Sequence, residues 1–235
     1  NRTTIYGSYD HGIFGALERC TDHLLHSDGK PRQILWKIHS KKSILTTGSI
    51  ERPIAFGNND RPGIMTASAV RAYVNRWGVL PGKQTAIFTN NDDGWATAKI
   101  LSDRGMEVAA VIDSRKCDPV ENIPGASIIM GGKIVNTSGR KRIKNITLVN
   151  GQIIPCDCLA VSGGWSPNVH LTCHQGGRPN WAPNLNAFRP GSNLPKNMAV
   201  AGSANGSFNL QSVLTEGLKA AHDVLDGLEM KESKV

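Results

Sequence analysis

Runs of apolar residues along the first fifty positions predict mainly strands. Residues 3–9 alternate in polarity and carry β-branched and aromatic side chains, a pattern typical of a strand. Residues 12–25 are expected to form a loop or a short helical turn. Two further strand-like runs, 34–39 and 43–47, are joined by a basic pair, which predicts a hairpin or a meander.

Two segments have apolar residues at helical spacing. The first covers residues 64–77, and Gly78 is placed to end it, because glycine adopts the left-handed conformation of a helix C-cap. The apolar stripe of this helix, expected to face the core, consists of Met65, Ala69, Val70, Tyr73, Val74 and Trp77. The second helix follows the strand and turn "MAVAGSANG" at 198–206. Its apolar face consists of Leu210, Val213, Leu214, Gly217, Leu218, Ala221, Val224 and Leu225.

A third helix is expected between two apolar strands in "KQTAIFTNNDDGWATAKILSDRGMEVAAVIDSR", residues 83–115. A strand, a turn, a helix and a second strand ending in Asp113 have the outline of a dinucleotide-binding βαβ unit. Short strands are expected from 127 to 161, with Asn150-Gly151 as a hairpin turn. A polar, proline-rich stretch at 175–197 is predicted to be a long surface connection.

The turn of this βαβ unit departs from the G-x-G-x-x-G pattern of phosphate-binding loops. Thr89 occupies the first glycine position, Asn91 the second and Gly94 the third. Asp92 and Asp93 fall at the start of the helix, where we expect them to cap free backbone N–H groups. A carboxylate about 4 Å from a phosphate would cost roughly 4 kcal/mol at an effective dielectric constant of about 20. The turn is therefore predicted to exclude a dinucleotide, and the aspartate that ends the second strand is interpreted as structural.

Length and composition fit a globular protein. With 235 residues, 39% of them hydrophobic, the chain can form one large domain or two interleaved smaller ones. No apolar run approaches the roughly 20 residues that a membrane span requires, and no signal peptide is recognisable. We therefore expect a soluble protein without a membrane partner.

The formal net charge of +8 is spread along the chain. The one dense basic run is Arg140-Lys141-Arg142 with Lys144, which we interpret as a solvated hairpin rather than a phosphate-binding surface. No nucleic-acid partner is expected.

The five cysteines do not form an even set at the spacing of a disulfide framework, which favours a reducing compartment, by default the cytoplasm. Cys156, Cys158 and Cys173 suggest zinc, because thiolates are zinc ligands. However, the C-D-C triplet begins an apolar strand, on which both thiols are expected to share one face. No metal site is therefore predicted. No hydrolase or metalloenzyme motif is recognised either, and His11 is interpreted as solvated.

Several segments resemble known flavoproteins. "ILTTGSIERP", "CLAVSGGWSPN" and "MAVAGSANG" resemble the segments that link the domains or contact the cofactor in flavoproteins with two dinucleotide-binding domains, such as thioredoxin reductase. Longer segments resemble the alpha subunits of heterotetrameric sarcosine oxidases. These are "RTTIYGSYDHG", "PRQILWKI", "ERPIAFGNNDRPGIMTASAVRAYVNRWGVLPGK", "FTNNDDGW" and "LAVSGGWSPNVHLTCHQGGRP".

This resemblance implies an α/β fold of two interleaved Rossmann-like, three-layer ββα nucleotide-binding domains of the thioredoxin-reductase type. Residues 1–78 and 163–235 would form the first domain, and residues 79–162 an inserted second domain with a degenerate glycine loop. In the family, the glycine-rich phosphate loop lies upstream of the T-G segment, in a part that this chain does not contain. We therefore expect an internal fragment whose first domain is incomplete.

The resemblance also implies a function. The family's enzymes oxidise sarcosine to glycine with FAD on the beta subunit and pass electrons to FMN between alpha and beta, where dioxygen becomes hydrogen peroxide. The methyl carbon leaves as formaldehyde or is captured by tetrahydrofolate. The alpha-subunit domain holds an NAD that takes no part in turnover. The implied role is an NAD-binding scaffold, inactive by itself, that assembles with the rest of alpha and with the beta, gamma and delta subunits.

The same resemblance places the cofactor contacts in two turns. One half of the NAD is expected at Thr47 and Gly48, and the other half at Gly202, Ser203, Ala204 and Asn205. Flavoproteins of this fold usually carry Asp at the position of Ser203 to bind the ribityl chain of FAD, so an uncharged residue suits NAD. Two alternatives stay open. One is an NAD(P)H-dependent flavin oxidoreductase of the pyridine nucleotide-disulfide family, which would need a redox C-x-x-C, and the other is a structural module with empty nucleotide pockets.

Overall fold

The structure, a computed structural model, describes residues 1–228, so the last seven residues of the predicted first domain, 229–235, lie outside the described residues. Unit 1 consists of residues 1–50 together with the chain from residue 166 onward, and unit 2 consists of residues 51–165. The division differs from the boundary after residue 78 that the sequence predicts. Residues 51–78 group with unit 2 because their strand and helix pack on its sheet.

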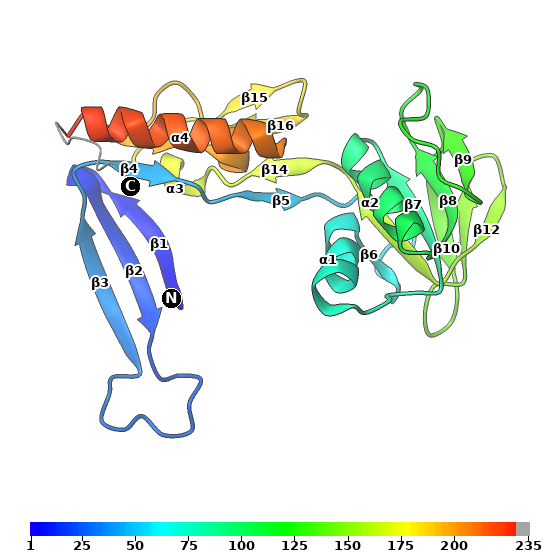
Figure 1. The fold of residues 1–235 in the computed structure, drawn as a ribbon, viewed down its shortest axis with the longest axis horizontal. Coiled ribbons are helices and arrows are strands. Elements are labelled where there is room, and N and C mark those ends of the chain that lie inside the picture. The colour runs from blue at the N-terminus through cyan, green and yellow to red at the C-terminus, as the bar shows by residue number, and fades with distance from the viewer. Residues whose placement is uncertain (229–235) are drawn as a thin grey trace. The chain divides into compact units, whose positions relative to one another are not determined.

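Unit 2 is built on a five-stranded parallel sheet with the order β6-β13-β7-β8-β9. Figure 1 labels β6, β7, β8 and β9 of this sheet. Two helices and a three-stranded antiparallel sheet, β10-β11-β12, complete the unit. The parallel strands are β6 (Ile64–Thr66), β7 (Gln84–Thr89), β8 (Glu107–Asp113), β9 (Ser127–Met130) and β13 (Cys158–Ser162). The other elements are α1 (Ala67–Trp77), α2 (Asp92–Asp103), β10 (Ile134–Ser138), β11 (Asn145–Leu148) and β12 (Ile153–Pro155).

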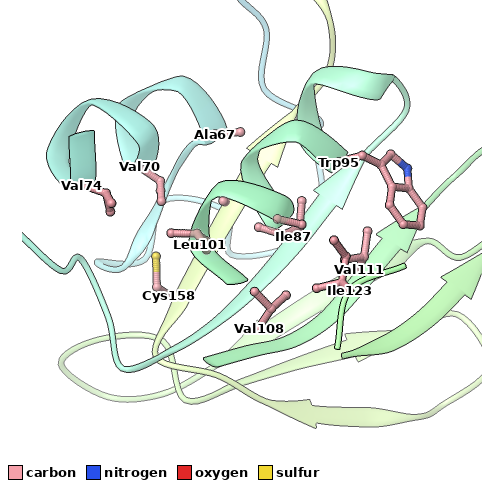
Figure 2. Close-up of a cluster of buried hydrophobic side chains, with 12 residues drawn as sticks. Ala67, Val70, Val74, Ile87, Trp95, Leu101, Val108, Val111, Ile123 and Cys158 are labelled. Carbon is pink, nitrogen blue, oxygen red and sulfur yellow. The ribbon is translucent and has the colours of Figure 1, made fainter. Parts of the chain in front are cut away.

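An apolar cluster covers each face of the parallel sheet. On one face, Ile87 of β7 packs with Val70 of α1 and Leu101 of α2 (Figure 2). On the other face, Phe88 of β7 packs with Ile146 of β11, because successive residues of a strand point to opposite faces. Burial of both faces is what a parallel sheet requires. Unit 2 therefore has the three-layer ββα arrangement that the sequence predicts.

Helix α1 buries only part of the apolar stripe predicted for it. Val70 and Val74 are buried, but Tyr73 is 41% exposed and Trp77 is 56% exposed. Gly78 ends the helix in the left-handed conformation at φ 62°, as predicted, and its N–H donates to the Tyr73 carbonyl. The aromatic edge of α1 thus lies outside the core.

Unit 1 begins with a three-stranded antiparallel sheet of β1 (Thr3–Tyr9), β2 (Ile13–Arg19) and β3 (Gln33–His39), with the turn η1 (Asp10–Gly12) between the first two. β2 replaces the loop or helical turn that the sequence predicts over residues 12–25. It pairs on both edges, and its alternating Phe14 and Ala16 are buried, which satisfies its backbone and its apolar side chains together.

The second strand of the predicted hairpin, β4 (Ser43–Leu45), does not pair with β3. It pairs in parallel with β17 (Met198–Val200), far along the sequence. Neither the hairpin nor the meander predicted for these two runs forms, because β3 belongs to the β1-β2-β3 sheet and β4, among the described residues, pairs only with β17.

The remaining elements of unit 1 follow the return of the chain. The proline-rich stretch predicted as a surface connection contains a short hairpin, in which Trp181 packs on Phe188 with ring centroids 5.1 Å apart. The elements are α3 (His170–Cys173), β15 (Asn180–Ala182), β16 (Ala187–Arg189), η2 (Gly202–Asn205) and α4 (Leu210–Asp226). The strands β5 (Ser49–Glu51) and β14 (Trp165–Pro167) form a two-stranded sheet.

Helix α4 forms as predicted, but much of its apolar face is exposed. Leu210, Leu214 and Leu218 are 73%, 59% and 63% exposed, respectively, whereas Ala220 is buried. Within residues 1–228, none of the helices has the length and hydrophobicity of a membrane span.

Candidate functional site

The six residues predicted to contact a cofactor come together at the carboxyl ends of β4 and β17. These strands run in parallel, with Leu45 opposite Val200. The chain then continues from β4 into Thr47 and Gly48 and from β17 into the turn η2. An ideal Cβ at Gly48 would lie 4.0 Å from the hydroxyl oxygen of Ser203, so the two turns face each other. The carboxyl ends of parallel strands are where α/β sheets bind ligands. The η2 residues are Gly202, Ser203, Ala204 and Asn205.

Hydrogen bonds to Asn168 fix the first turn. Asn168 donates its Nδ2 to the Thr47 carbonyl at 2.9 Å, and the Thr47 hydroxyl donates to the Asn168 carbonyl at 3.0 Å. The Asn168 N–H donates to the Gly48 carbonyl at 3.0 Å. Gly48 has φ 77°, a conformation that glycine adopts without strain. The Thr47 hydroxyl is therefore engaged within the protein, and the Gly48 backbone forms the open part of this turn.

Glu216 of α4, which was not predicted from the sequence, holds the second turn. Its carboxylate accepts hydrogen bonds from the Gly202 N–H at 2.9 Å, from Asn205 Nδ2 at 3.4 Å and from the Ser207 hydroxyl. The Gly202 N–H and the Asn205 amide are thus occupied within the protein. The sequence offered one signal for this role of Glu216. It lies four residues before Ala220, the buried residue of α4, and therefore on the same side of the helix.

At the degenerate loop of unit 2, Asn91 rather than an aspartate caps helix α2. The Asn91 side-chain oxygen accepts from the Asp93 N–H at 3.0 Å. Its Nδ2 donates to the Ser162 carbonyl at 3.0 Å, which joins the loop to β13. The expectation that Asp92 and Asp93 cap the helix was wrong. Asn91 occupies the N-cap position, from which a side-chain oxygen can reach a free N–H group of the first turn.

The two aspartates bind arginines instead. Asp93 forms an ion pair with Arg71 of α1 at 2.8 Å, and Asp92 forms one with Arg115 at 2.8 Å. Arg115 also binds Asp113 at 2.8 Å. Three carboxylates thus face two guanidinium groups, and one net negative charge remains. The sequence suggests that two unpaired carboxylates would repel a phosphate at this loop. With these ion pairs, that repulsion is smaller than expected.

Side chains fill the loop where a phosphate would approach. The Thr89 hydroxyl accepts from the Asn91 N–H at 3.1 Å, so this N–H is not free. A Cβ at Gly94 would lie 2.4 Å from the Thr89 side chain, so only glycine allows α2 to pack this closely on β7. Gly94 therefore keeps the helix-packing role of the third glycine, while Thr89 and Asn91 occupy the space left by the first two.

Asp113 is structural, as interpreted from the sequence. It is fully buried, and Trp95 Nε1 donates to its Oδ2 at 2.8 Å. Burial raises the pKa of the Asp113 carboxyl, but hydrogen bonds from Arg115 and Trp95 outweigh burial and hold the pKa below its ordinary value of 3.8. Asp113 therefore orients Arg115 and secures α2 to the end of β8.

Cys156 and Cys158 do not share a face. Cys156 belongs to the apolar cluster below β10–β12, whereas Cys158 belongs to the cluster below α1 and α2. The prediction of a common face was wrong because β13 begins at Cys158. Cys156 precedes the strand and does not follow its alternation. The residue between the cysteines, Asp157, accepts from the N–H groups of Lys83 and Gln84 at 3.1 and 2.9 Å. Among the described residues, no cluster of three or more metal-ligating side chains is found.

Burial also makes both thiols poor nucleophiles. It raises the pKa of Cys156 to about 12 and that of Cys158 to about 11, from 9.0. Because the thiolate is the reactive form, neither residue is suited to redox chemistry at neutral pH.

A cavity of about 420 Å³ lies in unit 1 at the amino ends of β4 and β17, the ends opposite the two cofactor turns. His11 lines it in the left-handed conformation at φ 61°, beside Lys41 and Lys196. The cavity is therefore separate from the candidate site at the carboxyl ends, and its basic lining is suited to an anion.

Comparison with known proteins identifies relatives of this chain. No protein-family model matches the chain. The alpha subunit of sarcosine oxidase from Rhizobium meliloti (strain 1021) is 41% identical over 228 residues, which are 95% of this chain and 23% of that protein. The alpha subunit from Corynebacterium sp. (strain U-96) is 36% identical over 238 residues, 92% of this chain and 24% of that protein. The chain thus spans about a quarter of the length of these relatives.

Solved structures confirm the fold. L-proline dehydrogenase from P. horikoshii superposes with a TM-score of 0.75 at 19% identity, over 98% of this chain and 42% of that one. Thioredoxin reductase from T. acidophilum gives a TM-score of 0.69 at 14% identity, over 97% and 74%. At these identities the likeness concerns the fold alone, which is of the thioredoxin-reductase type.

Proposed function

Because the chain is related over nearly its whole length to the alpha subunits of sarcosine oxidases, as the sequence resemblance implied, we propose that it forms the NAD-holding part of such a subunit. In this proposal the NAD is structural and supplies no chemistry to turnover. The segment scaffolds the interface that bears FMN, while FAD and the oxidation of sarcosine lie elsewhere in the complex. The beta, gamma and delta subunits and the remainder of alpha are its partners, in the cytoplasm.

The juxtaposition of Gly48 and Ser203 is the observation that supports this proposal most directly. The turn after β4 and the turn η2 after β17 are far apart in the sequence. They lie next to each other at the carboxyl ends of these two paired parallel strands. Among the described residues, no other heavy atom within 4 Å faces the position of a Cβ on Gly48. A cofactor backbone can approach there as closely as glycine permits.

The chemistry of the second turn fits NAD. Ser203 is uncharged, and the nearby carboxylate of Glu216 is engaged by hydrogen bonds from Gly202, Asn205 and Ser207. Glu216 therefore shapes the turn and does not face a phosphate as a free anion. Thr47 and Gly48 would hold one half of the dinucleotide, and Ser203 and Ala204 the other, with Gly202 and Asn205 setting the path of the turn.

The degenerate loop of unit 2 is not a second NAD site in this proposal. Its first N–H groups are already bonded to Thr89 and Asn91, and its arginines are bound to aspartates. A flavin disulfide reductase would need a redox C-x-x-C, which the sequence lacks. The alternative of an NAD(P)H-dependent reductase therefore gains no support from these residues.

The test measures NAD released by denaturing the purified full-length protein. We expect NAD in a near-stoichiometric amount. Ser203→Asp should lower it at least tenfold, because a carboxylate beside a pyrophosphate is repulsive. Arg115→Lys, in the closed loop, is the matched control and should leave the NAD content unchanged. A full-length protein without NAD, or an equal loss in both variants, would refute the proposed site.

A further inference from the structure

The end of helix α1 exposes a continuous apolar segment of unit 2. Tyr73, Trp77, Val79 and Leu80 are between 41% and 56% exposed, although they lie within eight residues of one another. The sequence pattern places Tyr73 and Trp77 on the stripe that is buried at Val70 and Val74. Large exposed apolar groups that are adjacent to one another are typical of binding surfaces, whereas single ones are not.

Tyr73, Val79 and Leu80 line a groove of about 390 Å³, and the ring of Trp77 packs against that of Tyr73. Met65, Tyr73, Leu80 and Pro81 supply its apolar walls, and Arg142 lies at its edge. The Val79 N–H donates to the Tyr73 carbonyl at 3.0 Å, which holds the loop against the helix end. The groove is therefore formed before any ligand arrives, so little conformational entropy is lost on binding.

The residue types in this region are those that dominate binding energy in protein interfaces. The rings of Tyr73 and Trp77 lie 5.4 Å apart between centroids, and the Arg76 guanidinium lies 5.3 Å from the centroid of the Trp77 ring. Trp, Tyr and Arg are enriched among interface hot spots. Such rigid aromatic groups bury a large area at a small entropic cost.

The charge around the groove is positive. Arg142 lines it, Arg76 lies over the Trp77 ring, and the β10–β11 turn adds the exposed Arg140, Lys141 and Lys144. Arg142 donates to the backbone carbonyl of Asp157, whose carboxylate accepts from the backbone N–H groups of residues 83 and 84. A partner with carboxylates is therefore favoured, and a second copy of this chain, with a net charge of +8, is disfavoured.

We propose that this aromatic–basic surface, formed by Met65, Tyr73, Trp77, Leu80 and Arg142, docks a separate acidic polypeptide. The partner places an apolar side chain in the groove and carboxylates beside Arg76 and Arg142. The basic run of the β10–β11 turn, interpreted from the sequence as merely solvated, then steers the partner to the groove. This interface does not depend on whether the two turns of unit 1 hold NAD.

Photocrosslinking in the full-length protein tests the identity of the occupant. A benzophenone amino acid replaces Trp77, and the protein is purified with the polypeptides that remain bound to it in stoichiometric amounts. We expect crosslinks to an acidic segment of a different polypeptide. Crosslinks confined to a second copy of this chain or to another part of the same chain would refute the proposal, as would the absence of any crosslink.

Substitutions then test the energetics. Trp77→Ala should weaken association with the crosslinked polypeptide by about tenfold to a hundredfold, as expected for a hot spot. Arg142→Glu should weaken it and reduce its dependence on salt. Trp181→Ala, a half-exposed tryptophan in unit 1, is the matched control and should have no effect. Because the Trp77 side chain is about half exposed, Trp77→Ala should leave thermal unfolding unchanged. If neither Trp77→Ala nor Arg142→Glu changes the affinity for the crosslinked polypeptide, the proposed docking surface is wrong.

Discussion

The indole N–H of Trp95, in helix α2, donates to the buried carboxylate of Asp113 at the end of β8, with 2.8 Å between nitrogen and oxygen. This bond joins the helix to the strand at the position where a dinucleotide-binding unit would hold a ribose. Both residues are almost completely buried. The acidic residue at this position is thus part of the packing.

Replacing Trp95 with Phe should destabilise unit 2. The substitution keeps an aromatic ring but leaves Asp113 Oδ2 with fewer donors in a buried position, a loss of about 1–3 kcal/mol. Urea unfolding followed by far-UV circular dichroism measures it. Trp181→Phe should change the free energy of unfolding by less than about 0.5 kcal/mol, because that ring is half exposed. Equal effects of the two substitutions would contradict the role of the Trp95–Asp113 bond.

The same carboxylate should contribute to acid sensitivity. The pKa of Asp113 is lowered in the folded state, so the unfolded state binds its proton more readily. The stabilisation is complete above the ordinary pKa of 3.8 and is lost as the pH falls through the lower folded value. Asp113→Asn should therefore be less stable than wild type at pH 7, with a shallower loss between pH 5 and pH 2. Parallel pH profiles for the two proteins would argue against this linkage.

Two glycines should respond in opposite ways to alanine. At Gly94 the added methyl group would lie 2.4 Å from Thr89, and we expect a loss of about 2 kcal/mol or more from the forced shift of α2. At Gly217, inside helix α4, an added methyl group meets no described atom within 4 Å apart from its chain neighbours and the backbone of its own helix. There, alanine should stabilise the helix by about 0.5–1 kcal/mol. Thermal unfolding of both variants provides the comparison, and a stabilising Gly94→Ala would show that α2 does not pack as described.

Native alkylation should separate the cysteines. Cys117 is exposed and should react with iodoacetamide at pH 8. Cys156 and Cys158 are buried with raised pKa values and should react only after denaturation. Peptide mass spectrometry gives the extent of labelling at each site. Rapid labelling of either buried cysteine in the native protein would be inconsistent with their burial in the two cores.

Local patterns predicted much of unit 2 because its elements follow one another with clear periodicity. The βαβ unit ending at Asp113, the stop at Gly78 and the Asn150-Gly151 turn are all present. Gly151 has φ 84°, as a tight hairpin requires. The two turns of the candidate site are adjacent, and their contact with NAD is still a proposal.

The features that could not be predicted from the sequence depend on contacts between residues that are far apart in the chain. β2 resembled a loop because glycine and charged residues interrupt its pattern, and its pairing with β3 compensates for this. Thr47 and Asn168 are 121 positions apart, so no local pattern signals their bonds. The arginines that pair with Asp92 and Asp93 come from outside the loop, which a local charge argument could not include.

The position of β13 has a consequence for synthesis of the protein. β13 is the last strand of the five-stranded sheet to leave the ribosome, yet it lies between β6 and β7 and pairs with both. Until residues 158–162 emerge, one edge of β6 and one edge of β7 lack the strand with which they pair in the folded sheet. Unit 2 should therefore reach its native state in one late step, with the earlier strands exposed to chaperones until then.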